Sequence, residues 1–307
     1  ALKLRSGSES VKPSKIGNPR GMTMTEPIMR KVNGDGITIQ LAVWEGKGSQ
    51  VLCVHGLTAN CRCWDVMASS LAPGKTILAI DLRGRGLSDK PASGYSMRHH
   101  IQDIFCVLDD LKQEKMVLMG HSLGAFISLA FAAHYPERTE KVILIDGGGQ
   151  LSQDQWEKVT VAIKPSLDRL GQVFPSFEAY VTLMKQAPFL QPWSQAIENY
   201  FQYESEAVEG GLRSRINPAN IQEEIKNIQQ EEPSEYYPKV SCPVLILRAT
   251  NGILSSDDLV LPESAVQKMV SKISNAQRAD IDGTNHFSIL FQPNAQRDRA
   301  IREFIEK

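Results

Sequence analysis

The feature that most constrains this sequence is an apolar run, Met116–Met119, which leads directly into Gly120-His121-Ser122-Leu123-Gly124. The run predicts a buried strand, and the small and apolar residues that follow, up to Tyr135, predict a helix. A strand that turns into a helix over so few residues needs glycines beside the serine, because larger side chains would clash. The pattern therefore predicts a strained Ser122 whose hydroxyl is exposed at the carboxyl end of a strand and at a helix N-terminus, where developing negative charge is favoured.

Short apolar runs and helical periods alternate along most of the chain. Buried strands are predicted at Val51–Val54, Thr76–Ile80, Val142–Ile145, Val244–Leu247 and Ala276–Ile281, and a half-buried strand at Ile37–Val43. Helices are predicted at Trp64–Leu71, Met97–Leu111, Gly124–Tyr135 and Ala295–Ile305. Continuous apolar strands separated by helices are typical of an α/β fold with a doubly wound, mostly parallel sheet, whose chemistry lies at the carboxyl ends of the strands.

The character of the sequence changes after Gly147-Gly148-Gly149. Residues 150–238 have helical spacing, several prolines, many aromatic residues and no convincing buried strand. We therefore expect an inserted helical cap at 149–238 within a core formed by 23–148 and 239–307. Residues 1–22 are polar and basic and lack the apolar segment of a secretory signal, so we expect a flexible N-terminal tail.

A serine hydroxyl is a weak nucleophile and needs a base. Of the six histidines, His286 follows the last predicted strand in a polar loop and comes after the serine, in the chain order of strand–turn–helix serine enzymes. A tetrahedral oxyanion needs two donors. Position predicts the backbone N–H of Leu123, directly after the serine, and that of Leu57 in the His55-Gly56-Leu57-Thr58 loop.

Two further segments have side chains that suit a site. Arg62 and Trp64 lie near the predicted oxyanion loop, and we consider them candidate substrate contacts. The glycines and charges of Asp81–Asp89 favour a rigid loop that supports the site rather than one that reacts.

Composition excludes several classes of partner. Lys and Arg number 34 against 35 Asp and Glu, which gives no electrostatic reason for nucleic acid or an anionic membrane as partner. No apolar run approaches the roughly 20 residues of a membrane helix. Five cysteines, an odd number, favour free thiols in a reducing cytoplasm, and Cys61 and Cys63 alone make a poor metal site. We expect a small-molecule substrate, no metal or organic cofactor, and a homodimer as an open possibility.

The motifs His55-Gly56, Asp81–Asp89, Gly120–Gly124 and the late His286 together resemble the α/β-hydrolase superfamily from about Ile28 onward. The resemblance implies a Ser–His–Asp triad, an acyl-enzyme and a serine hydrolase that cleaves an ester or a related acyl bond. Ser122 departs from the dehalogenase and epoxide-hydrolase branches, which have aspartate there. Carboxylesterases, lactonases and C–C hydrolases stay open, as does a ligand-binding protein without turnover.

The position of the acid is ambiguous. In many relatives it follows the strand after the cap, but here that loop, Arg248–Gly252, has Asn251 or Gly252 at the expected position. Asp257 and Asp258 come a few residues later. Asp146 ends the strand before the cap, and we favour it over both. This arrangement, with Gly86–Pro91 and Gly94-Tyr95, is similar to the (E)-2-(acetamidomethylene)succinate hydrolase branch, which supports Asp146 without assigning a substrate.

Overall fold

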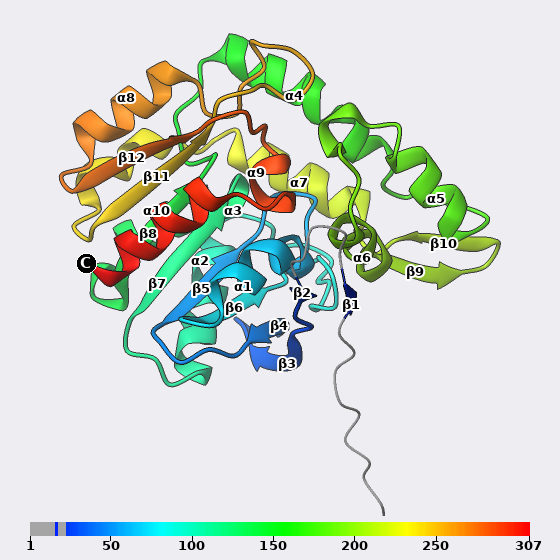
Figure 1. Cartoon of the computed structure of the whole chain (residues 1–307), viewed down its shortest axis with the longest axis horizontal. Helices are drawn as coiled ribbons and strands as arrows, with labels where there is room; N and C mark the ends of the chain where they lie inside the picture. The colour runs from blue at the N-terminus through cyan, green and yellow to red at the C-terminus, as the bar shows by residue number, and fades with distance from the viewer. Residues whose placement is uncertain (1–15, 18–22) are drawn as a thin grey trace, which may run out of the picture.

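An eight-stranded sheet runs through the centre of the computed structural model, which describes residues 16–17 and 23–307 (Figure 1). The strand order is β12-β11-β8-β7-β5-β6-β4-β3. The pairs β3–β4 and β4–β6 are antiparallel and the remaining pairs are parallel. The bounds are β3 Ile28–Asn33, β4 Thr38–Trp44, β5 Gln50–Val54, β6 Thr76–Ile80, β7 Met116–His121, β8 Thr139–Ile145, β11 Val244–Ala249 and β12 Ala276–Ile281.

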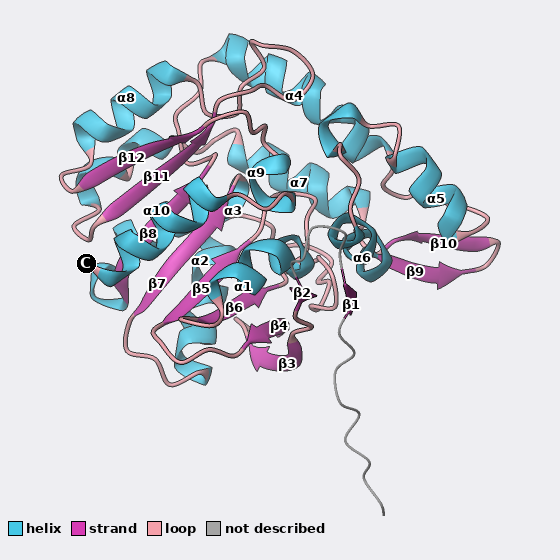
Figure 2. Cartoon of the chain, viewed as in Figure 1, coloured by secondary structure: helices cyan, strands magenta, loops and turns pink. Residues whose placement is uncertain are grey.

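Helices cover both faces of this sheet (Figure 2). Successive strand residues alternate between two cores, as the period of two requires. Leu118, Val142 and their neighbours pack with α2 (Met97–Asp110), α3 (Leu123–His134) and α8 (Glu263–Lys272), whereas Val117, Ile143 and their neighbours pack with α1 (Asp65–Leu71), α9 (Ser288–Phe291) and α10 (Ala295–Glu306). The predicted α/β fold is confirmed, and β7, which carries the serine motif, lies among the central strands.

Some elements differ from the prediction. The strand predicted as half-buried is almost wholly buried as β4, because β3 and β6 pair with its two edges and it packs against α2. Strand β3 itself was not predicted. Five of its six residues are exposed, so its sequence lacks an apolar signal. Helix α8 was also not predicted.

The segment between β8 and β11 extends beyond the carboxyl ends of the sheet strands (Figure 1). It contains α4 (Gln153–Asp168), α5 (Phe177–Met184), α6 (Gln195–Glu204), β9 (Ser205–Val208), β10 (Gly211–Ser214) and α7 (Pro218–Ile228). The antiparallel hairpin β9–β10 corrects the expectation of a wholly helical cap. Most residues of the hairpin are half-buried or exposed, so its sequence contains no continuous apolar run that would predict it.

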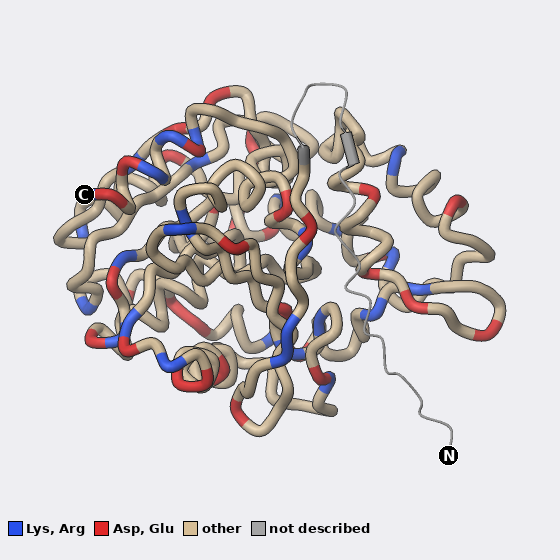
Figure 3. The backbone as a smooth tube through the Cα atoms, turned by 60° about the horizontal axis from the view of Figure 1, so that its bottom comes forward, with Lys and Arg blue, Asp and Glu red and all other residues tan. Residues whose placement is uncertain are grey.

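The remaining features concern the tail and the surface. Of the expected tail, 1–22, only Ile16–Gly17 (β1) lies within the described residues, where it pairs with Thr23–Met24 (β2). Acidic and basic residues are interspersed over the chain (Figure 3). Within the described residues, each helix is too short or too polar to traverse a lipid bilayer.

Candidate active site

Ser122 lies at the junction of β7 and α3 in a strained conformation, with φ 55° and ψ −120°. Its N–H donates to the Ile145 carbonyl of β8 at 3.1 Å, which fixes the turn against the neighbouring strand. A Cβ at Gly120 would lie 2.0 Å from the Gly124 carbonyl oxygen, and one at Gly124 would lie 1.9 Å from the Val54 oxygen. Both glycines are therefore required by close backbone contacts, as the motif predicts.

His286, in the loop after β12, contacts Asp146 at the end of β8. The distance from His286 Nδ1 to Asp146 Oδ2 is 2.7 Å, and both side chains are buried. The other carboxylate oxygen, Oδ1, accepts the Ala249 N–H of β11 at 3.1 Å. With Nδ1–H donating to the carboxylate, the Nε2 of His286 is left to accept a proton, which is the tautomer that a general base for a serine requires.

The two alternative acids lie elsewhere. Asp258 accepts the backbone N–H groups of Ile253, Leu254 and Ser255 and so closes its own loop. Asp257 is exposed and pairs with Lys158 at 3.2 Å. Of the three aspartates considered from the sequence, Asp146 is the one that contacts His286.

His121, the residue before the serine, supports His286 from the side. Its Nε2–H donates to the His286 carbonyl at 2.8 Å, and the centroids of the two rings are 4.4 Å apart. Burial, followed by the proximity of His286, lowers the pKa of His121 well below its usual value, so the ring is a neutral donor. A supporting role for His121 was not predicted from the sequence. Its place directly before the nucleophile was the one available signal.

The predicted oxyanion donors border the nucleophile. A Cβ at Gly56 would lie 3.1 Å from Ser122 Cβ, so the loop approaches the serine closely. Among residues 16–17 and 23–307, no hydrogen-bond acceptor pairs with the backbone N–H of Leu57 or Leu123. The Gly56 carbonyl, in the same peptide unit as the Leu57 N–H, accepts from His55 Nδ1 at 2.8 Å and from Ala59 N–H at 3.2 Å.

The His55 ring is fixed as a neutral tautomer. Its Nε2 accepts the Leu82 N–H at 3.0 Å, which leaves Nδ1–H to donate to the Gly56 carbonyl. Burial lowers the pKa of His55 to about 4. Donation to the carbonyl polarises the shared peptide unit and strengthens its N–H as a donor.

Two cavities adjoin Ser122 and His286, and Leu57 and Ile163 also line both. The larger, of about 260 Å³, is lined mainly by apolar side chains that include Leu123, Phe126, Trp156, Val159 and Val260. The smaller, of about 80 Å³, is lined by aromatic residues that include Phe189, Tyr200, Phe201, Phe287 and Phe291. Ser122 therefore lies where a substrate has room on two sides.

The structure does not place Arg62 and Trp64 beside Ser122, which corrects the prediction that they contact substrate. Arg62 donates to both Asp65 oxygens at 2.7–2.9 Å and pairs with Glu26 at 2.9 Å, while Trp64 is fully buried in the core. Neither residue lines a cavity beside Ser122. The charge of Arg62 is paired with Asp65 and Glu26, and Trp64 packs within the core.

The loop Asp81–Asp89 has the supporting position expected of it. Asp81 accepts the N–H groups of Cys61 at 2.7 Å and Leu87 at 2.9 Å, and the Tyr203 hydroxyl at 2.6 Å. Arg83 forms a buried two-point pair with Asp103. These contacts join the loop to the turn at Cys61, to α2 and to α6.

Comparisons with known proteins identify the family of the chain. The family model of the alpha/beta hydrolase fold matches residues 50–293. A 2-(acetamidomethylene)succinate hydrolase of Mesorhizobium japonicum is 29% identical over 229 residues, which are 75% of this chain and 80% of the relative. A serine hydrolase-like protein of Dictyostelium discoideum is 28% identical over 275 residues, covering 83% of this chain and 75% of that protein.

Solved structures give the same result. The crystal structure of an E-2-(acetamidomethylene)succinate hydrolase superposes with a TM-score of 0.81 at 26% identity, over 92% of this chain and 100% of that one. The resemblance predicted from the motifs is thereby confirmed. The chain belongs to the α/β-hydrolase fold family and is a hydrolase of that superfamily.

Proposed function

We propose that this protein is a serine acyl hydrolase in which Ser122, His286 and Asp146 form the catalytic triad. The observation that carries the proposal is the 2.7 Å contact between His286 Nδ1 and Asp146 Oδ2. It stands beside a strained serine that borders the same cavity as the histidine.

In the proposed mechanism, His286 Nε2 accepts the Ser122 hydroxyl proton as the serine oxygen attacks a substrate carbonyl carbon. The backbone N–H groups of Leu57 and Leu123 donate to the resulting oxyanion. Collapse breaks the bond to the leaving group, which takes the proton from His286, and leaves an acyl-serine. Water then attacks that ester with His286 again as base, releasing a carboxylic acid and the free serine.

The cavities favour a neutral, mainly apolar acyl group. Apart from histidines, the charged side chains that line them are Glu231 and Arg169, and the Arg169 guanidinium is paired with buried Glu204 at 2.8 Å. A carboxylate in the substrate would have to be desolvated without an unpaired cation among the described lining residues. The relative named for a succinate derivative therefore supports the reaction type, and the cavity supports a different substrate class.

Replacing Ser122 tests the mechanism. Ser122→Ala should lower kcat on 4-nitrophenyl butyrate by about three orders of magnitude or more, because the attacking oxygen is gone. A fluorophosphonate probe should label the unaltered protein at Ser122 and leave the variant unlabelled. Near-normal turnover by the variant would rule the mechanism out, and an unlabelled, inactive natural protein would favour a ligand-binding protein.

Two esters of equal chain length test the substrate class. We expect kcat/KM for 4-nitrophenyl butyrate to exceed that for mono-4-nitrophenyl succinate by about tenfold or more, because the latter carries a distal carboxylate. A preference for the succinate monoester would contradict the neutral-substrate proposal while leaving the triad untouched.

A further inference from the structure

The carbonyl of Leu57, the residue that carries a proposed oxyanion donor, is held by an arginine. Arg85 Nε and Nη2 donate to the Leu57 oxygen at 3.0 and 2.9 Å, and Arg85 Nη1 donates to the Arg83 carbonyl at 2.9 Å. The Arg85 side chain is fully buried. A buried guanidinium needs a counter-charge, because removing it from water is costly.

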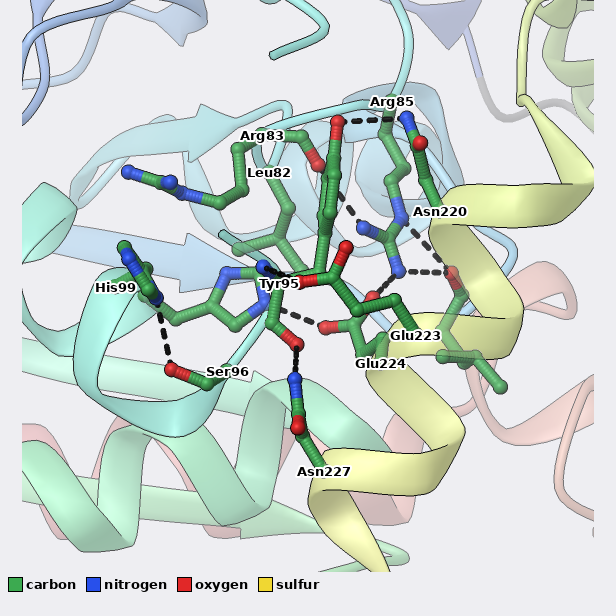
Figure 4. A network of polar contacts seen from close by, with 12 residues as sticks. Leu82, Arg83, Arg85, Tyr95, Ser96, His99, Asn220, Glu223, Glu224 and Asn227 are labelled. Atoms are coloured by element: carbon green, nitrogen blue, oxygen red, sulfur yellow. Dashed lines mark hydrogen bonds and ion pairs between the residues drawn. The ribbon is translucent and has the colours of Figure 1, made fainter. Parts of the chain in front are cut away.

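That counter-charge comes from the cap. Glu224 of α7 pairs through Oε2 with Arg85 and through Oε1 with His100 Nε2, and it too is buried (Figure 4). Burial, followed by Arg85 and Arg83, lowers the pKa of His100 well below its usual value, so the neutral ring donates Nε2–H to the glutamate. Glu224 therefore accepts from a core arginine and a core histidine at once.

Further polar contacts along α7 seat it on the core. Glu223 accepts the N–H groups of Gly94 at 2.9 Å and Tyr95 at 3.0 Å, while Asn220 donates to the Tyr95 hydroxyl and Asn227 to the Tyr95 carbonyl (Figure 4). Ile228, the last residue of the same helix, lines the larger cavity. Helix α7 therefore lines the larger cavity through one residue and, through another, pairs with the arginine that binds the oxyanion loop.

The next residue of the loop is held in a parallel way. The Thr58 carbonyl accepts from Arg169 Nη2 at 3.0 Å and from the Tyr200 hydroxyl at 3.1 Å, and Arg169 is paired with buried Glu204. The two donors, Arg169 and Tyr200, both belong to the cap segment. Two successive carbonyls of the oxyanion loop are therefore bound by arginines, each neutralised by a glutamate of the cap.

We propose that Arg85 and Glu224 are positioning residues for the oxyanion loop, so that the seated cap sets the direction of the Leu57 N–H. His55 and Ala59 fix the carbonyl on the N-terminal side of that N–H, and Arg85 fixes the carbonyl on its C-terminal side. With both carbonyls held, the backbone dihedrals of Leu57 have little freedom, and the donor points at the serine before substrate binds. This inference rests on the proposed function.

A paired substitution tests it without leaving a lone buried charge. In Arg85→Met with Glu224→Met, the Leu57 carbonyl loses both donors. We expect kcat to fall about tenfold or more with KM within about threefold, because the N–H matters most in the transition state. A trifluoromethyl ketone, which forms an oxyanion on Ser122, should lose affinity by the same factor as kcat/KM. The matched control is Arg213→Met with Glu206→Met, a pair on the β9–β10 hairpin whose side chains are 49% and 31% exposed, and it should leave kcat, KM and ketone affinity unchanged.

Hydrogen exchange supplies a readout that does not need turnover. Backbone amides of 56–59 should exchange faster in the paired variant and at the natural rate in the control. A folded variant with natural kcat, ketone affinity and exchange would overturn the inference, and so would a rise in KM alone. If the paired variant does not fold, Arg85→Lys is used instead. This variant keeps the positive charge but not the two parallel N–H donors, so it should show smaller losses of kcat and ketone affinity. Failure of the natural protein to label at Ser122 bears on the proposed function alone, since exchange still reports on the loop.

Discussion

Three non-glycine residues of the described chain have positive φ angles: Lys112 at 56°, Ser122 at 55° and Asp146 at 45°. Two of the three are the proposed nucleophile and the proposed acid. Such conformations cost free energy and persist only where the surroundings impose them. Here backbone hydrogen bonds hold the two residues in these conformations. The Ser122 N–H donates to the Ile145 carbonyl, and the Asp146 N–H donates to the Leu247 carbonyl at 2.8 Å. Adjacent strands thus hold the two side chains at the carboxyl ends of the central strands.

Asp146 is the proposed acid, and Asp146→Asn should lower kcat by about two to four orders of magnitude, because a neutral amide neither stabilises the imidazolium nor enforces the tautomer. The measurement is steady-state turnover of 4-nitrophenyl butyrate. Asp257→Asn is the matched control and should stay within about twofold of the natural kcat, since Asp257 is exposed and pairs with Lys158. If Asp257→Asn or Asp258→Asn caused the loss and Asp146→Asn did not, the assignment of the acid would be wrong.

The positions of residues in backbone motifs could be predicted from the sequence, whereas the partners of individual side chains could not. Ser122 and His286 are placed by a turn motif and by the end of a strand. Of the two partners of Arg62, Asp65 lies three positions away and was visible in the sequence, whereas Glu26 lies 36 positions away, outside any local pattern. Arg85 and Glu224 were missed for the same reason, being separated by 139 positions.

At the scale of elements, α4 forms the wall that the two cavities share. Ile163 of this helix lines both, together with Ser122 and His286. Strands of the sheet were predictable because burial on both faces requires continuous apolar runs. Strand β3 and the hairpin β9–β10 were not, since residues exposed to water carry no such pattern.

Enlarging Ile163 should therefore change the acyl-chain preference. We expect Ile163→Phe to lower kcat/KM for 4-nitrophenyl octanoate by about tenfold and that for the acetate by less than about threefold, because the added ring takes up space in cavities that Ile163 lines. Val161→Phe on the same helix is the control, as Val161 is 68% exposed and lines neither cavity. An equal loss on both esters for Ile163→Phe would mean that the wall does not select by length.

At the scale of the whole molecule, three buried histidines, His55, His100 and His121, have pKa values lowered by burial. The unfolded chain takes up protons near pH 6.5, before the folded chain does, so stability falls as pH drops through that value. For His55, with its pKa at about 4, the loss approaches about 3 kcal/mol by pH 4. Asp65 acts in the opposite direction, because burial raises its pKa to about 6 and the folded state then binds the proton first.

As the pH falls, the three histidines lower the free energy of unfolding and the one aspartate raises it, so we expect a net loss of stability in mild acid. Urea unfolding should give a lower free energy of unfolding at pH 5 than at pH 7, with the slope on denaturant unchanged. A free energy that is constant or larger at pH 5 would contradict the prediction.

Three apolar side chains that border the larger cavity take no part in the buried ion pairs of Glu204 and Glu224. Trp156, Val159 and Val260 line the cavity, whereas Glu204 pairs with Arg169 and Glu224 pairs with Arg85. A saturation library at these three positions therefore leaves both ion pairs intact. We expect such a library to be a starting point for the directed evolution of new substrate ranges.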